Sequence, residues 1–209
     1  YEPAKPIDNG HQIRLADDLK NIVSEKQIML RFQPQVDREG QTSGAEALLR
    51  WNHPKLGLLA PEKFMEIAER RGIADEINAY VLEQAAKLLG AWQADPELRG
   101  LRLAVNIGSD QLYDPELPRS LRELFKRHSA PASLLTLEFT EESIAKNRDE
   151  AMKAMARLKT TGVRLSLDDF GTGFSSLAQL KDMPLSEIKI DGRFIRQMHD
   201  RPKDAALVK

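Results

Sequence analysis

The sequence predicts an α/β fold, a β/α barrel, from two observations. Short β-like runs alternate with helical stretches along most of the 209 residues, which is typical of βα units and a mainly parallel sheet. Five successive runs also carry a polar residue near the end where the chain leaves the strand. The pattern of elements alone fits an open doubly wound sheet as well, but in a barrel the carboxyl ends of all strands converge on one face. The polar strand ends therefore favour the barrel.

The elements follow in a regular order from the N-terminus. Residues 1–14 are interpreted as a linker from an upstream region and residues 15–209 as one domain, opened by a helix over 14–27 with apolar residues at helical spacing. Residues 52–54, Asn-His-Pro, are interpreted as a turn, with His53 making no more than a minor contact. The expected strands are 28–36, 43–51, 101–107, 134–140, 163–169 and 185–191, and the expected helices are 61–72, 78–93, 117–128, 148–162 and 174–183.

Composition excludes several classes of protein. The 31 basic and 32 acidic residues nearly cancel, which argues against a partner that is a nucleic-acid polymer. The chain has no cysteine, so neither disulfides nor thiolate chemistry is available. We find neither an apolar run long enough to span a membrane nor a signal peptide. We expect a cytoplasmic protein, or the cytoplasmic part of a membrane-anchored one.

The polar residues at the strand ends are rich in oxygen ligands. In chain order they are Glu46 and Arg50, Asn106, Glu138 and Glu141, Asp168 and Asp169, and Lys189 and Asp191. Carboxylate and amide oxygens suit Mg²⁺ or Mn²⁺, and the scattered histidines match no zinc spacing. Two such ions could clamp the attacking and leaving oxygens of a phosphoryl displacement. Lys189 would lie near the bound hydroxide or a phosphate oxygen, and Arg50 would offer a fork to a phosphate.

Each of these signals is weak alone. Two aspartates before a glycine turn are more often a surface loop, and Thr140 with the following glutamates is more often a helix N-terminus. Lys189 could be a solvated edge residue, and Arg50 could stack on Trp51. Their recurrence at successive strand ends favours the functional interpretation.

The same residues carry a family resemblance over nearly the whole chain, from about Leu15 on. Its motifs are "FQP", "GAEALLRW" followed by "HPKLGLLAPEKFMEIAE", "AVNI", "LEFTEE", "LDDFGTGFSSL" and "IKIDGRFI". In this order they resemble the EAL-domain family of cyclic di-GMP phosphodiesterases, which is named after the residues here at Glu46 to Leu48. The resemblance implies a modified (β/α)8 barrel with one antiparallel strand, and hydrolysis of cyclic di-GMP to linear 5′-pGpG with Mg²⁺ or Mn²⁺.

The resemblance also assigns roles to single residues. Lys189 resembles the residue that orients the nucleophilic water, and Glu141 resembles the anchor of the loop that follows Asp169. The substrate pocket would include Gln33, Leu48 and Arg50, and the metal ligands would be Glu46, Asn106, Glu138, Asp168 and, for a second ion, Asp169. The family further implies a homodimer and upstream sensory or GGDEF-type domains in the full-length protein.

The sequence departs from the family in two places. Gly108 stands where a serine is usual, which removes a possible support for the loop after Asn106. The last two βα units, with motifs resembling "AEGVE" and a later "QG", are absent from the 209 residues. We therefore expect a C-terminally incomplete domain, without the catalytic glutamate and the pocket glutamine that those motifs supply.

Two other functions compete with the phosphodiesterase. A non-catalytic cyclic di-GMP receptor would use the same pocket to signal to a partner, and a dimerisation scaffold would need no pocket at all. Degenerate receptors of the family typically lose metal ligands, whereas the five expected here are present. That favours the enzyme.

Overall fold

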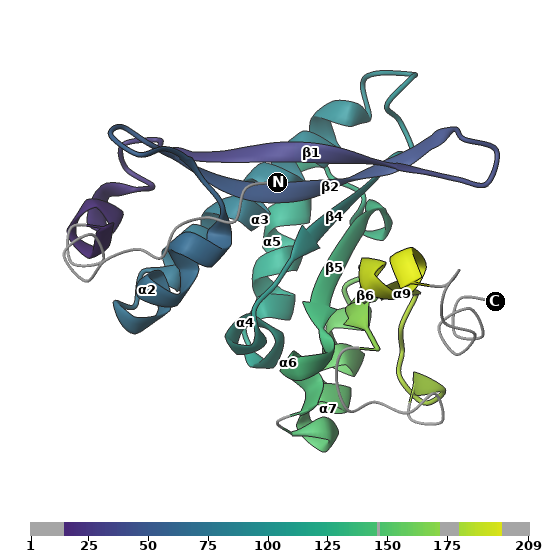
Figure 1. Ribbon diagram of the computed structural model, residues 1–209. Helices are drawn as coiled ribbons and strands as arrows, with labels where there is room; N and C mark the ends of the chain where they lie inside the picture. Colours follow the sequence, from purple (N-terminus) through teal and green to yellow (C-terminus); the bar gives the residue numbers. More distant parts are fainter. Residues whose placement is uncertain (1–14, 146, 172–179, 198–209) are drawn as a thin grey trace.

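A computed structural model describes residues 15–145, 147–171 and 180–197 as one α/β structure around a single sheet (Figure 1). The sheet order is β1-β2-β4-β5-β6-β7, with β3 paired to β2. The strands are β1 (Ile28–Val36), β2 (Thr42–His53), β3 (Gly57–Leu59), β4 (Arg102–Asn106), β5 (Leu135–Thr140), β6 (Arg164–Phe170) and β7 (Glu187–Ile190). From β2 to β7 successive neighbours are parallel, whereas β1 and β3 run antiparallel to β2.

Helices connect the parallel strands and pack behind them. The 3₁₀ turns are η1 (Leu19–Asn21), η2 (Pro61–Lys63) and η3 (Ala132–Leu134), and the α-helices are α2 (Met65–Arg70), α3 (Ala74–Trp92), α4 (Ser109–Tyr113), α5 (Leu117–His128), α6 (Glu141–Ala145), α7 (Arg148–Lys159) and α9 (Gly192–Gln197). Figure 1 shows α3 and α5 behind β4 and β5. No helix in the described part of the chain is long and apolar enough to cross a membrane.

All six expected strands are present, and so are the helices expected over 61–72, 78–93, 117–128 and 148–162, some of them with changed ends. The helix expected over 61–72 is divided into η2 and α2, and the one expected over 78–93 begins earlier, at Ala74. The N-terminal helix is shorter than expected: the chain is helical only at 15–18 and then forms η1. The linker over 1–14 and most of the helix expected over 174–183 lie outside the described residues.

The two faces of the parallel sheet differ in polarity. Side chains alternate along a strand, so in β4 the buried Leu103 and Val105 face the helices and Asn106 lies on the other side. In β5 the apolar Leu137 and Phe139 likewise alternate with Glu138. The apolar face therefore forms the core with the helices, and the opposite face presents polar groups.

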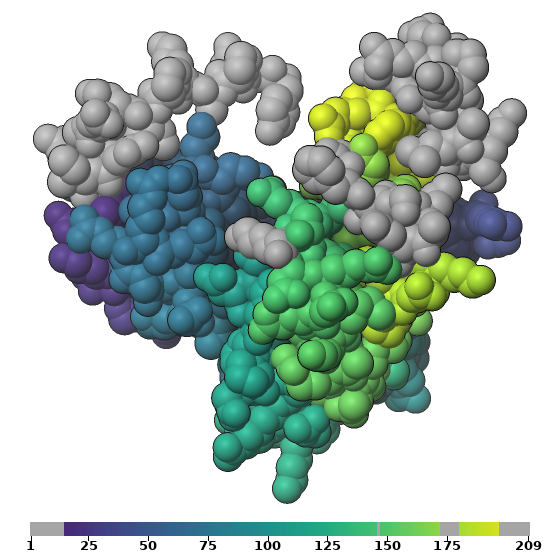
Figure 2. All heavy atoms as spheres, turned by 90° about the horizontal axis from the view of Figure 1, so that it is seen from below, coloured from purple at the N-terminus to yellow at the C-terminus, as the bar shows by residue number. Residues whose placement is uncertain are grey.

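The interpretation of residues 52–54 as a turn is wrong. Asn52 and His53 belong to β2, and the turn begins at Pro54. His53 is buried, its Nε2 lies 3.2 Å from Asp18 Oδ2, and its Nδ1 accepts from the backbone N–H groups of Lys55 and Leu56. His53 thus joins the N-terminal segment to the β2–β3 turn. In Figure 2 the purple residues near the start of the described chain lie beside blue ones.

The crossing of α3 and α5 predicts a large stability effect at Gly90. A Cβ placed on Gly90 would lie 2.1 Å from the backbone oxygen of His128. Gly90→Ala should therefore destabilise the chain by about 1–3 kcal/mol, because overpacking outweighs the better helix propensity of alanine. Urea unfolding measures it, with Gly108→Ala as the control because a Cβ there meets nothing within 4 Å. Equal midpoints for Gly90→Ala and wild type would contradict the crossing.

Candidate metal centre

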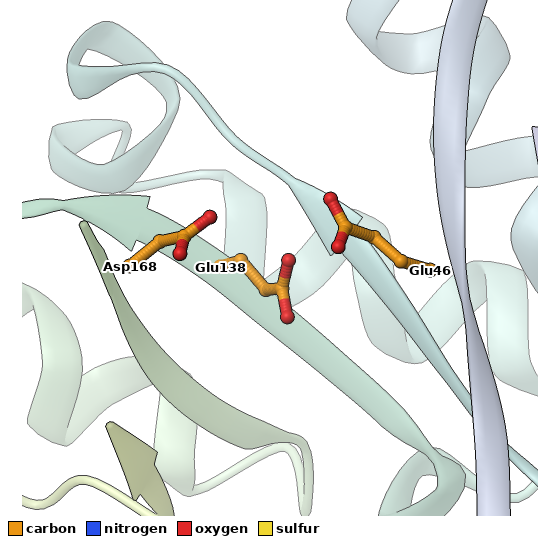
Figure 3. Close-up of side chains that lie close together, drawn as sticks. All are labelled: Glu46, Glu138 and Asp168. Carbon is orange, nitrogen blue, oxygen red and sulfur yellow. The ribbon is translucent and has the colours of Figure 1, made fainter. Parts of the chain in front are cut away.

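Three carboxylates meet at the carboxyl ends of the parallel strands. Glu46, Glu138 and Asp168 come from β2, β5 and β6, and one oxygen of each lies within 4.8 Å of the other two. Figure 3 shows the three side chains pointing toward one another from their separate strands. We refer to these residues as the carboxylate cluster. The parallel pairing of neighbouring strands brings these positions close together. Glu138 of β5 pairs with Asn106 of β4, and Asp168 of β6 pairs with Thr140 of β5.

Lys189 of β7 extends into the carboxylate cluster. Its Nζ donates to Glu46 Oε2 at 2.9 Å, to Glu138 Oε2 at 2.9 Å and to Asp168 Oδ2 at 3.2 Å. The ammonium offers three donors, and all three bonds are to ionisable oxygens. The structure thus places a positive charge where the like charges of the cluster would otherwise repel.

Burial governs the electrostatics of Glu138. Its side chain is fully buried, and desolvation raises its pKa to about 7, although the hydrogen bond and charge of Lys189 act in the opposite direction. Burial alone would lower the pKa of Lys189, but hydrogen bonding and attraction to Glu138, together with Glu46 and Asp168, outweigh it and raise that pKa. With its pKa raised, Lys189 is protonated in this arrangement and donates hydrogen bonds to the carboxylate cluster.

Asn106 and Asp169 flank the carboxylate cluster. Asn106 Nδ2 donates to Glu46 Oε1 at 3.0 Å, which holds the amide beside the cluster. Asp169 follows Asp168 directly, and burial together with the charges of Asp168 and Asp191 raises its pKa. Its carboxylate does not belong to the three-membered group.

Glu141 lies at the start of α6 and is buried. Its Oε2 accepts a hydrogen bond from the backbone N–H of Gly171 at 3.3 Å. The side chain therefore contacts the beginning of the loop that follows β6. This is the segment that the sequence resemblance expects Glu141 to anchor, and residues 172–179 of that loop lie outside the described part.

A pocket of about 440 Å³ adjoins the carboxylate cluster. Leu48 and Arg50 line it together with Glu46 and Asn106. Arg50 Nη1 donates to the carbonyl oxygen of Leu49 at 2.7 Å, and the side chain is half-buried. Gln33 pairs with Glu46 across β1 and β2, so both side chains project from the same face of the sheet.

Sequence reasoning missed the opposite wall of this pocket. Met65 and Glu69 of α2 and Asn78 and Val81 of α3 contribute to its lining. The helical pattern predicted these helices but carried no signal that they would border the strand ends. That border depends on how the helices cross the sheet.

The donor set fits a divalent cation that prefers oxygen ligands. Glu138 Oε1 is buried and, among the described residues, has no hydrogen-bond partner. A buried carboxylate oxygen without a partner is costly, and a cation beside it would remove that cost. The carboxylate and amide oxygens, among which the Lys189 ammonium also lies, are ligands typical of a hard divalent cation.

Fold and site together define an α/β protein of the β/α barrel class with a carboxylate centre at its strand ends. The sequence profile of the EAL domain family matches residues 16–209, and the chain belongs to this family. The EAL domain is a TIM-barrel-like α/β fold, which confirms the fold class and the family predicted from the sequence.

Individual relatives agree with this membership. The chain is 37% identical over all its 209 residues to the "bifunctional diguanylate cyclase/cyclic di-GMP phosphodiesterase MucR" of Pseudomonas aeruginosa, of which it spans 30%. It is 34% identical over 194 residues, 92% of its length, to the "cyclic di-GMP phosphodiesterase NbdA" of the same organism, of which it spans 25%. A solved structure titled "PaMucR phosphodiesterase, c-di-GMP complex" superposes with a TM-score of 0.86 at 38% identity, covering 93% of this chain and 79% of that one.

Proposed function

We propose that this chain is the phosphodiesterase module of a cyclic di-GMP signalling protein and hydrolyses cyclic di-GMP to linear 5′-pGpG. The observation that carries the proposal is the carboxylate cluster, joined by Lys189 and bordered by a pocket that Arg50 lines. Family membership and relatives named as cyclic di-GMP phosphodiesterases support it.

In this proposal Glu46, Asn106, Glu138 and Asp168 hold a Mg²⁺ or Mn²⁺ ion, and Asp169 serves a second one. When bound, such ions make water a better nucleophile and polarise a phosphoryl oxygen. Lys189 remains protonated, so it donates hydrogen bonds that orient the attacking water. Arg50 and Leu48 position the substrate, with the Arg50 guanidinium presenting two parallel N–H groups to a phosphate. Gln33 extends the pocket from β1, and Glu141 holds the loop after β6.

Hydrolysis of cyclic di-GMP by the full-length protein, with the units expected to supply the catalytic glutamate, tests this function. We expect 5′-pGpG to appear in the presence of Mn²⁺ or Mg²⁺, followed by anion-exchange chromatography, and to disappear with EDTA. A full-length protein that binds cyclic di-GMP with either ion yet never yields 5′-pGpG would overturn the enzyme and identify a receptor. The homodimer and the upstream domains expected from the resemblance remain predictions.

Replacing Arg50 separates charge from geometry in the proposed phosphate contact. Arg50→Ala should weaken binding of cyclic di-GMP about 10- to 100-fold, because hydrogen bonds to a charged group are worth about 1.5–3 kcal/mol. Arg50→Lys should weaken it less, because lysine keeps a point charge but loses the fork. Calorimetry with Ca²⁺, which we expect to support binding without turnover, measures both. Equal affinities for the two variants and wild type would remove Arg50 from the phosphate site.

A further inference from the structure

The two aspartates of β6 lie in an irregular part of the sheet. Leu167 pairs with Ile188 of β7 but Phe170 pairs with Ile190, so β6 has one more residue than β7 over this stretch. Such β-bulges re-aim side chains and often lie next to active sites. Asp169 within the bulge has φ 53°, and Gly171 just after it has φ 96°. Positive φ values are uncommon for residues other than glycine, although aspartate adopts them more readily than most.

Contacts from two other elements surround this bulge. Glu141 of α6 accepts from Gly171, as described above. From α9, the ring of Phe194 occupies the space that a side chain on residue 171 would need, since a Cβ on Gly171 would lie 2.6 Å from Cε2 and 2.8 Å from Cζ. The ring thus lies directly against the Gly171 backbone.

Phe194 is also tied to the strand that carries Lys189. Its N–H donates to the carbonyl oxygen of Asp191 at 3.0 Å, and the Asp191 N–H points to the carbonyl oxygen of Phe170 at 3.4 Å. The Asp191 carboxylate accepts from the Arg193 backbone at 2.6 Å, which fixes the start of α9. The ring, Asp191 and Lys189 therefore share a short stretch of chain that contacts the bulge on one side and the carboxylate cluster on the other.

We propose that Phe194 is a positioning residue: its ring, pressed against Gly171, holds the bulge that aims Asp169 beside the carboxylate cluster. The part of this inference that concerns cation binding rests on the proposed function. In this inference Phe194 is not itself a ligand. It acts through the backbone of residues 169–171, and its removal should loosen Asp169 relative to Asp168.

A double-mutant cycle tests the contact between the ring and the glycine. Gly171→Ala should destabilise the chain through both its positive φ and the ring. In the Phe194→Ala background only the φ cost remains, so Gly171→Ala should shift the urea midpoint clearly less there than in wild type. Equal shifts in the two backgrounds would overturn the contact.

Metal binding and amide exchange test the positioning role. Phe194→Ala should speed hydrogen exchange at the amides of Asp169 and Gly171 and weaken Mn²⁺ binding by calorimetry about 10- to 100-fold, as loss of an outer-sphere support does. Phe194→Leu should recover most of both effects. Ile195→Ala, on the exposed neighbour in the same helix, should change neither.

The outcomes separate this inference from the proposed function. Faster exchange in Phe194→Ala with unchanged Mn²⁺ affinity would overturn the positioning role and leave a packing contact. Unchanged exchange would overturn the inference entirely. If the wild-type chain binds no Mn²⁺, the proposed function and the metal part of this inference both fail, and exchange at Asp169 and Gly171 still decides whether Phe194 holds the bulge.

Discussion

Asp168→Asn is expected to abolish metal-dependent hydrolysis of cyclic di-GMP while leaving the fold intact. Asparagine keeps the size of the side chain and one oxygen but removes a negative charge from a site whose ligands are all oxygens. Loss of an outer-sphere partner alone costs about 10- to 100-fold in metal affinity, and loss of a direct ligand charge should cost more. Glu46→Gln should behave in the same way, because both residues belong to the carboxylate cluster.

The measurement combines Mn²⁺ calorimetry with the rate of 5′-pGpG formation. Asp182→Asn is the matched control, because it makes the same chemical change at an exposed position outside the carboxylate cluster. Asp182→Asn should retain wild-type affinity and rate. Near-wild-type hydrolysis by Asp168→Asn or Glu46→Gln at ordinary Mg²⁺ would refute the metal assignment.

The sequence was sufficient for six of the seven described strands because each of these carries its own signal, whereas the three-residue β3 was not predicted. In β4 the apolar Leu103 and Val105 alternate toward the helices, and the polar Asn106 marks the strand end. Repetition of this pattern in successive strands predicted that the polar ends would converge, and the cluster of Glu46, Glu138 and Asp168 has that placement. Their roles as ligands remain predictions.

What the sequence could not predict depends on contacts between distant segments. The three hydrogen bonds of Lys189 require the register of β7 against β6, which no local pattern specifies. The bulge at Asp169 likewise appears only when β6 is paired with its neighbour. His53 is another example. The residues Asn-His-Pro are typical of a turn, yet His53 lies in β2, where it packs against Trp51 and contacts Asp18.

Short elements, apart from the helix N-terminus weighed as an alternative at Thr140, were missed for a different physical reason. The helices α4 and α6 are five residues each, too short for helical periodicity to be visible. They depend on tertiary contacts, such as the bond from Tyr113 Oη to the carbonyl oxygen of Ser143 at 2.8 Å. Because Glu141 begins α6 and accepts a hydrogen bond from Gly171, the contacts that stabilise α6 also support the start of the loop after β6.

Lys189→Met is expected to destabilise the chain strongly when EDTA keeps divalent cations away. The substitution retains an unbranched side chain but removes the ion pair between Lys189 and Glu138. The Glu138 side chain is buried, so water cannot replace the lost partner. Removing one partner of a buried pair typically costs about 3–5 kcal/mol. The side chain of Lys189 is 25% exposed, and Glu138, whose pKa burial raises to about 7, would take up a proton without the ammonium. We therefore expect a loss of about 3 kcal/mol or less.

A second substitution at Glu138 shows whether charge is the cause. In the double variant Glu138→Gln with Lys189→Met the buried charge is gone, so most of the stability should return, since replacing both partners of a buried pair is often neutral. Urea unfolding of the wild type, both single variants and the double variant completes the cycle. If the double variant is as unstable as the sum of the single ones, Lys189 contributes by packing and not as the counter-charge of the carboxylate cluster. A large coupling would instead mean that the same ammonium which orients water in the proposed reaction also stabilises the fold around Glu138.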